Sequence, residues 1–175
     1  MGKLLLHTCC APCGSAVLEK LINNYNITLF FYNPNIMPYA EYNKRLGEVR
    51  RLADIFGVEL TEAEYENELF TEKIKGLENE PEKGRRCELC IELRLRKTAE
   101  AAKAHGFEFF TTTLSVSPHK DFDTISRIIS ETDPQRGLAK DFKKQDGYKR
   151  SVELSKQHGF YRQNYCGCNF NRSAP

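Results

Sequence analysis

Apolar residues recur along the chain in two alternating patterns, one typical of buried strands and one typical of amphipathic helices. Residues 3–8 and 25–33 are short runs rich in strand-forming side chains, and residues 13–24 between them carry apolar positions at helical spacing. These three segments predict a βαβ unit, in which a helix joins two parallel strands.

The alternation continues through the rest of the chain. Residues 39–56 predict a long helix that ends at Gly57, because glycine readily adopts the left-handed conformation that closes a helix. Residues 58–65 predict a weak third strand, and residues 107–119 give the strongest strand signal of the sequence. Further helices are predicted over residues 90–106, 121–130 and 146–159, before a tail over residues 160–170.

Strands that alternate with helices predict a Rossmann-like (HUP-like) fold, with a doubly wound, mostly parallel sheet flanked by helices. A length of 175 residues and an apolar content of 40% suit a single domain, which we expect to span residues 1–175. Because open α/β sheets bind ligands beyond the carboxyl ends of their strands, the segment after the first strand is the expected site.

Composition bears on where the protein works and on what its cysteines do. The apolar run at the start of the chain is too short for a signal peptide or a membrane span, so we expect a cytoplasmic protein without a membrane partner. In a reducing compartment, seven cysteines favour metal binding or redox chemistry over a disulfide framework. The net charge of +2 neither requires nor excludes a nucleic-acid partner.

The cysteines fall into three groups: Cys9, Cys10 and Cys13 after the first strand, Cys87 and Cys90 at a helix start, and Cys166 and Cys168 in the tail. The CxxC spacing of the middle pair lets two thiolates reach one metal ion. Two thiolates from the first group would complete a set of four, which suits an iron–sulfur cluster and zinc equally well. Burial as a small apolar side chain is the alternative for Cys13.

The tail pair has a different spacing, with a single glycine between the two cysteines. A disulfide between Cys166 and Cys168 would be strained and easily reduced, a property that favours a redox couple. Gly167 supplies the backbone freedom that such a small ring needs. Two further metal ligands are the alternative for this pair.

Four separated motifs carry a resemblance. They are HTCCAPCGSA at residues 7–16, YNPNIMPYAEYNKR at residues 32–45, RRCELC at residues 85–90, and DFKKQDGYKRSVELSKQHGFYRQNYCGC at residues 141–168. In this order they resemble the QueH family of epoxyqueuosine reductases. The resemblance implies the last step of queuosine biosynthesis, in which the epoxide oxygen of epoxyqueuosine in tRNA is removed to leave a cyclopentene. It also implies an iron–sulfur cluster, a [4Fe-4S] cluster, and no cobalamin.

The chemistry of that reaction agrees with a metal cluster. Removing the oxygen of an epoxide takes two electrons, which ordinary side chains cannot deliver. We therefore expect the redox couple Cys166 and Cys168 to act in catalysis beside the cluster. Cys13 is held as a reserve ligand. The expected cluster ligands are Cys9, Cys10, Cys87 and Cys90.

A second, mononuclear iron is a further expectation. It would polarise the epoxide oxygen and would need a hard oxygen ligand. Asp141 is the first candidate because it lies among basic residues in one of the four motifs. A helix cap or a surface carboxylate is the alternative for this residue.

Basic and aromatic residues toward the end of the chain predict the tRNA-binding surface. The expected contacts are Lys143, Lys144, Lys149, Arg150 and Arg162. A solvated helix face is the alternative. Because a base must leave its stack to reach the metal, we expect an open cleft. The remaining partner is an electron donor that the sequence does not identify, and we expect a monomer.

Two other classes of function remain open on the residues alone. An ATP-using tRNA-modifying enzyme would share the sheet and the cysteines, but the turn after the first strand lacks a glycine-rich phosphate loop. A zinc-stabilised RNA-binding module would share the cysteines without the redox chemistry. The single histidines are expected to be structural, and His7 is the one nearest the first cysteines.

Overall fold

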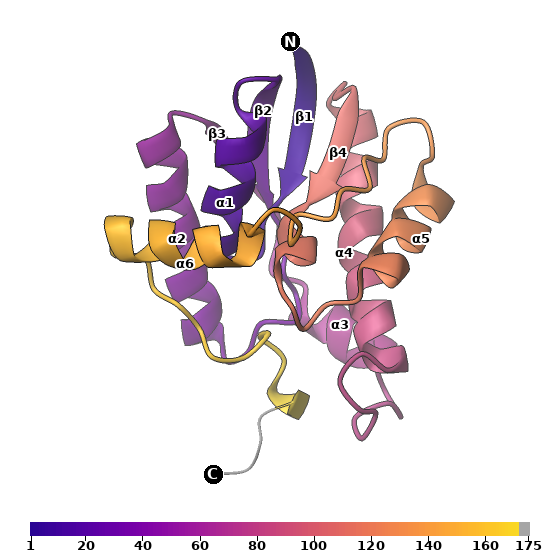
Figure 1. Ribbon diagram of the computed structural model, residues 1–175. Coiled ribbons are helices and arrows are strands. Elements are labelled where there is room, and N and C mark those ends of the chain that lie inside the picture. Colours follow the sequence, from indigo (N-terminus) through magenta and orange to yellow (C-terminus); the bar gives the residue numbers. More distant parts are fainter. Residues whose placement is uncertain (172–175) are drawn as a thin grey trace.

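Four parallel strands form the centre of the structure, a computed structural model that describes residues 1–171 (Figure 1). The strands are β1 (Gly2–His7), β2 (Tyr25–Phe31), β3 (Glu59–Glu62) and β4 (Phe109–Thr112). They lie in the order β3-β2-β1-β4, and every neighbouring pair is parallel. This order and direction are those of a doubly wound sheet, so the predicted fold class is confirmed.

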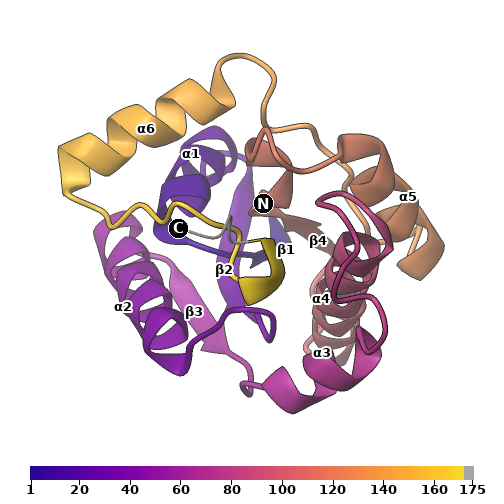
Figure 2. The ribbon, with the colours of Figure 1, turned by 90° about the horizontal axis from the view of Figure 1, so that it is seen from below.

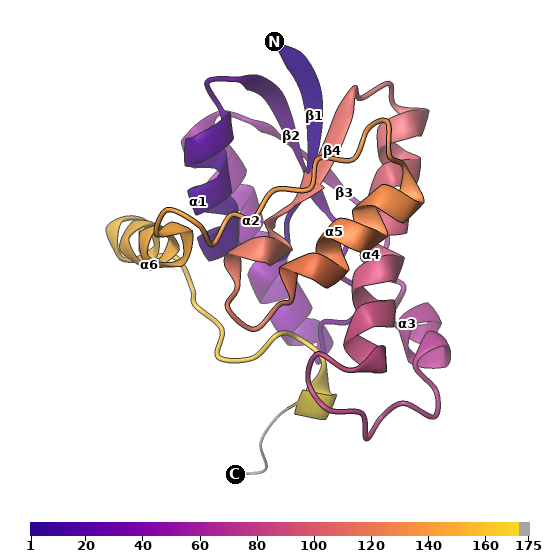
Figure 3. The same ribbon diagram turned by 45° about the vertical axis from the view of Figure 1, so that its right-hand side comes forward.

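Helices cover both faces of the sheet, as Figures 1 and 3 show. One side carries α1 (Ala11–Leu21), α2 (Tyr39–Phe56) and α6 (Gly147–His158). The other side carries α3 (Asn67–Lys73), α4 (Arg85–Ala104) and α5 (Phe122–Thr132). Two short 3-10 helices are η1 (Thr113–Val116) and η2 (Asn169–Asn171). None of the helices described is both long enough and apolar enough to cross a membrane.

The core divides into two layers because side chains alternate along a strand. Leu4 and Leu6 of β1 pack with α1 and α2, while Leu5 packs with α4 and α5. All three leucines are buried. Complete burial of a leucine side chain contributes about 1.5–3 kcal/mol to folding, so this short apolar strand stabilises both layers at once.

The structure differs most from the predicted elements at three places. Helix α4 begins at Arg85 rather than at Cys90. The strand predicted over residues 107–119 ends at Thr112, whose hydroxyl accepts a hydrogen bond from Leu114 N at 3.1 Å and so begins η1. Threonine side chains compete with strand pairing in this way. Helix α3 was not predicted, since its short span buries a single side chain, Phe70. The predicted helix end at Gly57 is confirmed by its left-handed backbone, with φ of 63°.

Three separate segments gather at the carboxyl edge of the sheet, at the bottom of Figure 1. These are the turn after β1, the loop that leads into α4, and the tail after α6. Figure 2, seen from below, shows the tail crossing under the strands between α2 and α4. The fold therefore brings the three cysteine groups to one edge, where sheets of this class bind their ligands.

Candidate functional site

The turn after β1 holds three thiols close together. Cys10 is the N-cap of α1 and has an extended backbone, so the chain changes direction at this residue. The sulfur atoms of Cys9, Cys10 and Cys13 all lie within 4.8 Å of one another. All three cysteines are free thiols. Cys13, the reserve ligand, therefore belongs to the same group as two of the expected cluster ligands.

The thiols of this turn differ in acidity. Hydrogen bonding with the Cys10 thiol, and then with the Cys13 thiol, holds the pKa of Cys9 well below its usual range. The Thr113 hydroxyl, 3.6 Å from Cys9 Sγ, acts in the same direction. Hydrogen bonding with its neighbours and burial raise the pKa of Cys13. Cys9 is thus the most acidic thiol of the group, and the thiolate is the form that binds a metal.

His7 ends β1 in the core, directly before this turn. Its Nδ1 is 2.9 Å from Thr112 Oγ1 and its Nε2 is 3.0 Å from the Tyr32 carbonyl oxygen. Because a carbonyl only accepts, Nε2 donates, and Nδ1 of the neutral ring accepts from Thr112. Burial lowers the pKa of His7 to about 4. The ring is neutral and joins three strand ends, so the structural role expected for it is confirmed.

The tail couple has the geometry of a reactive dithiol. The sulfur atoms of Cys166 and Cys168 are 3.7 Å apart. Hydrogen bonding with Cys168, followed by the positive charges of Lys120 and Arg94, lowers the pKa of Cys166 to about 5. The same hydrogen bond raises the pKa of Cys168. A thiolate beside a thiol is the arrangement that thiol–disulfide exchange requires.

The segment after β2 fixes the position of this couple. Arg45 of α2 donates hydrogen bonds to the carbonyl oxygens of Cys166, at 3.2 Å, and Tyr165, at 3.1 Å. Met37 N donates to the Gly167 carbonyl oxygen at 2.8 Å, and Tyr165 Oη donates to the Met37 carbonyl oxygen at 2.6 Å. Three consecutive tail residues, 165–167, are therefore bound to α2 and to the loop before it.

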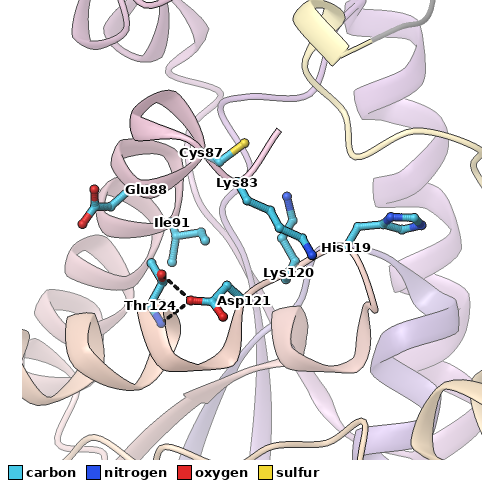
Figure 4. A pocket seen from close by; sticks show the side chains of 8 residues that line it. All are labelled: Lys83, Cys87, Glu88, Ile91, His119, Lys120, Asp121 and Thr124. Atoms are coloured by element: carbon cyan, nitrogen blue, oxygen red, sulfur yellow. Dashed lines mark hydrogen bonds between the residues drawn. The ribbon is translucent and has the colours of Figure 1, made fainter. Parts of the chain in front are cut away.

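The CxxC pair lies in the first turns of α4 beside the tail. Cys90 is 8% exposed and packs with Cys168 in a small apolar cluster that includes Phe70. Cys87 is 7% exposed and lines a small recess together with Lys120 and six other residues (Figure 4). Cys90, one of the expected cluster ligands, therefore also neighbours the expected redox couple.

A cavity of about 420 Å³ opens between these groups. Cys9, Cys10 and Cys13 line it from the β1 turn, and Cys166 lines it from the tail. Lys120 lines both this cavity and the recess of Cys87, so the two spaces are neighbours. The charged residues that line the 420 Å³ cavity are Arg45, Arg94, Lys120, Arg162 and Glu82. The volume suits a small ligand, and the lining favours a ligand with negative charge.

Asp141 lies outside the lining of this cavity. Its Oδ1 accepts a hydrogen bond from Lys143 N at 3.1 Å and lies 4.0 Å from Lys143 Nζ. These contacts give the carboxylate a local role in the turn before α6. Its expected role as a metal ligand stays a prediction.

The basic residues expected to bind tRNA occupy different environments. Arg162 lines the cavity and donates to Ser155 Oγ at 3.2 Å. Lys143 Nζ donates to the Lys120 carbonyl oxygen at 3.0 Å, and Arg150 forms ion pairs with Glu19 and Glu153. Lys144 and Lys149 are exposed. Their joint role in binding tRNA stays a prediction.

Sequence reasoning missed Arg94, Lys120 and Arg45 at this site. A signal for Arg94 was present, because residues 87, 90 and 94 follow at spacings of three and four and so share one face of a helix. A charged residue on the face that carries two buried cysteines is unusual unless the site uses it. Lys120 and Arg45 had no comparable signal, since tertiary folding alone brings them to the cavity.

Known proteins with similar sequences indicate the family of this chain. Residues 4–174 match the sequence model of a family described as epoxyqueuosine reductase QueH. The chain is 41% identical over 172 residues to the epoxyqueuosine reductase QueH of Haemophilus influenzae, covering 95% of this chain and 70% of that protein. It is 39% identical over 176 residues to the protein of that name in Thermotoga maritima, covering 97% and 90% of the two chains.

A solved structure resembles the fold at low sequence identity. The U34-tRNA thiolase NcsA from Methanococcus maripaludis, described with its [4Fe-4S] cluster, has a TM-score of 0.59 and 10% identity to this chain. The likeness covers 97% of this chain and 61% of that chain. At this identity it supports the α/β fold.

The parallel sheet and the thiols at its carboxyl edge define the class, an α/β protein with a site suited to a metal centre held by sulfur. Three thiols within 4.8 Å of one another, with no carboxylate among them, form a donor set that fits an iron–sulfur cluster. The chain belongs to the epoxyqueuosine reductase QueH family. The resemblance carried by the four sequence motifs is thereby confirmed.

Proposed function

We propose that this protein is an epoxyqueuosine reductase that acts on tRNA. It removes the epoxide oxygen of epoxyqueuosine by a two-electron reduction and leaves the cyclopentene of queuosine. The observation that carries the proposal is the family match over residues 4–174, together with the approach of all three cysteine groups to one edge of the sheet. The reaction is proposed to need no cobalamin.

Sulfur ligands at the carboxyl edge hold the cluster in this proposal. A [4Fe-4S] cluster would supply electrons one at a time, which the side chains of the cavity cannot do. Its proposed ligands are Cys9, Cys10, Cys87 and Cys90. Cys13 is a rival to either partner from α4, because its sulfur lies with those of Cys9 and Cys10.

The tail cysteines transfer electrons in this proposal, and the cavity with its basic residues binds the substrate. The tail couple, Cys166 and Cys168, receives reducing equivalents from an electron donor, and its position beside Cys90 supports transfer toward the cluster. The open cavity admits the modified base after it leaves the anticodon stack. Arg162 at the cavity, Lys144 before α6 and Lys149 within α6 bind the phosphates around it.

The activity is tested with protein prepared without oxygen. Enzyme with its full iron complement is mixed with tRNA that carries epoxyqueuosine and with a chemical reductant, in the absence of cobalamin. The expected result is a nucleoside lighter by one oxygen atom, detected by mass spectrometry after digestion of the tRNA. Recovery of unchanged epoxyqueuosine from iron-loaded, reduced enzyme would contradict the proposal.

The ligand assignment is tested by three single substitutions. Cys87→Ala and Cys90→Ala are each expected to remove most of the cluster iron, because three thiolates rarely retain what four hold. Cys13→Ala is the matched control and is expected to keep the iron and the visible spectrum. Full iron in both α4 variants, with loss of iron in Cys13→Ala, would exchange the roles of these residues.

A further inference from the structure

Arg94 is a buried cation at the cavity with no carboxylate partner in the described chain. It is 2% exposed and lies on α4, one turn after Cys90. Its Nε donates to the Cys90 carbonyl oxygen at 3.1 Å. Among residues 1–171 its terminal nitrogens have no hydrogen-bond acceptor, and no carboxylate lies within 4.0 Å of the guanidinium. The donors of both terminal nitrogens are therefore available to a ligand.

The other buried arginines of the described chain show what Arg94 lacks. Arg45 pairs with Glu41 at 2.8 Å and also donates to two tail carbonyl oxygens. Arg86 donates to the carbonyl oxygens of the loop before α4, among them that of Glu78 at 2.7 Å. Burying a charge without such partners is costly, and an arginine stays charged at any physiological pH. The terminal nitrogens of Arg94 therefore favour a ligand oxygen that accepts hydrogen bonds, most strongly one that gains negative charge during the reaction.

The position of Arg94 indicates where that ligand lies. Arg94 lines the 420 Å³ cavity together with Cys9, Cys10 and Cys166. Lys120 and Arg162 line the same cavity but are more exposed than Arg94. The buried guanidinium thus meets the part of a substrate that enters deepest, next to the cysteines, while the exposed cations meet parts nearer to solvent.

We propose that Arg94 binds the epoxide oxygen of the substrate and stabilises the negative charge that develops on it as each C–O bond breaks. This inference rests on the proposed function. In the balanced reaction the epoxide takes up two electrons and two protons, both C–O bonds break, a C=C bond forms, and the oxygen leaves as water. The electrons come from the reductant of the proposed reaction and the protons from solvent. Arg94 stays protonated and donates only hydrogen bonds.

Two substitutions at Arg94 and one control test the inference. Arg94→Gln removes the charge, and Arg94→Lys keeps the charge but loses the paired donors of the guanidinium. Arg96→Gln is the control, since Arg96 is an exposed residue of the same helix that pairs with Glu92. Circular dichroism, iron content and the visible spectrum are measured first, and all three variants are expected to match the unmodified enzyme.

The rate of a single turnover is the first functional readout. Removal of a donor to a developing oxyanion costs about 10²- to 10³-fold in rate, and this loss is expected for Arg94→Gln. Arg94→Lys is expected to fall between Arg94→Gln and the unmodified enzyme, and Arg96→Gln to change the rate less than twofold. If Arg94→Gln does not fold, Arg94→Lys still decides the question, and an unchanged rate for it would overturn the inference.

Binding gives a second readout that does not depend on turnover. The unmodified enzyme is expected to bind tRNA with epoxyqueuosine about tenfold more tightly than tRNA with queuosine, because only the former offers the epoxide oxygen to a charged donor. Arg94→Gln is expected to bind both tRNAs equally well. The measurement is a fluorescence titration with oxidised enzyme, in which no reduction occurs.

Other outcomes would give Arg94 a different role or would contradict the proposed function. Loss of iron in Arg94→Gln would show that the guanidinium balances the charge of the cluster, and equal weakening of both tRNAs with a smaller salt dependence would show a phosphate contact. Each result would overturn the inference. Failure of the unmodified, iron-loaded enzyme to convert epoxyqueuosine would instead overturn the proposed function.

Discussion

Cys166 and Cys168 show how one side chain changes the chemistry of another. Their 3.7 Å approach and the nearby positive charges lower the pKa of Cys166 to about 5, so at neutral pH this thiol is ionised while its partner holds a proton. The charge on Cys166 is present above that pKa and is lost as the pH falls through it. This arrangement suits thiol–disulfide exchange, and two metal ligands stay the alternative because a thiolate also binds metals.

The first prediction concerns the loss of this couple. Cys166→Ser combined with Cys168→Ser is expected to keep the iron and the visible spectrum but to lose multiple turnovers when a thiol-based donor supplies the electrons. A cluster reduced beforehand would still support a partial first turnover. Iron, spectrum and product per enzyme are measured in one preparation made without oxygen.

The outcomes separate the two roles considered for these cysteines. Loss of iron in the double variant would show that the two thiolates are ligands. Unimpaired multiple turnover would show that they are neither ligands nor a couple. Cys13→Ala is the matched control for removal of a cavity thiol outside the tail, and it is expected to keep multiple turnover.

At the residue scale, the sequence predicted which side chains belong to the site better than it predicted which groups they contact. The thiols were identified by their spacing, and His7 was assigned a structural role that the structure confirms. Arg94 was missed because a sequence does not show which buried arginines lack a carboxylate partner after folding.

At the scale of elements, the tail depends on one close contact with the segment after β2. Gly167 has a φ of 128°, a conformation that side chains rarely adopt. A Cβ at this position would lie 2.9 Å from Ile36 Cγ1 and 3.0 Å from Asn35 Nδ2. Glycine therefore allows both the turn between the two cysteines and the close approach of the tail to this segment.

The second prediction follows from this contact. Gly167→Ala is expected to loosen the tail at a local cost of about 1–3 kcal/mol, because strain and steric overlap act together. Faster hydrogen exchange at the peptide groups of residues 165–168 would report the change. Gly47→Ala is the matched control, since a Cβ at Gly47 meets nothing within 4 Å and alanine favours a helix.

The Gly167 prediction fails if exchange in the tail matches that of Gly47→Ala. Multiple turnover is measured in parallel, because a displaced couple would slow electron transfer while the iron of the cluster stays in place. A drop in iron content for Gly167→Ala alone would point to the tail cysteines as ligands.

Long periodic segments made the larger elements predictable. The helix ending at Gly57 and the two strands around α1 follow from local patterns, since each buries a continuous apolar face. The short β4 and the unpredicted α3 depend on contacts outside their own residues. The Thr112 hydroxyl accepts a hydrogen bond from Leu114 N, and β4 ends there. Phe70 of α3 is buried by residues of α4 and of the tail.

At the scale of the molecule, the site is a product of topology. The β1 turn, the start of α4 and the tail lie far apart in sequence and meet because all strands are parallel and end at one edge (Figure 2). The sequence predicted the edge from the fold class. It also grouped Cys13 with Cys9 and Cys10, as the structure has them. It did not predict that Cys90 would pack with Cys168, since that contact depends on side-chain packing.

The last prediction concerns exposed lysines that are expected to bind tRNA. Lys144 and Lys149 are exposed, and among residues 1–171 neither has a carboxylate within 4.0 Å of its ammonium group. Lys144→Ala combined with Lys149→Ala is expected to weaken tRNA binding and to reduce the slope of log Kd against log salt by about 2, or about 1 for each lost phosphate contact. Cluster absorbance is expected to stay unchanged.

A control at the opposite edge makes this result specific. Lys3→Ala combined with Lys103→Ala removes the same charge at the amino end of β1 and the carboxyl end of α4, where both lysines are exposed. This pair is expected to leave the salt dependence within experimental error, because screening limits the reach of an exposed charge to about 10 Å at 0.1 M salt. Equal slopes for the two double variants would show that the basic residues around α6 contribute net charge alone and make no contact with tRNA.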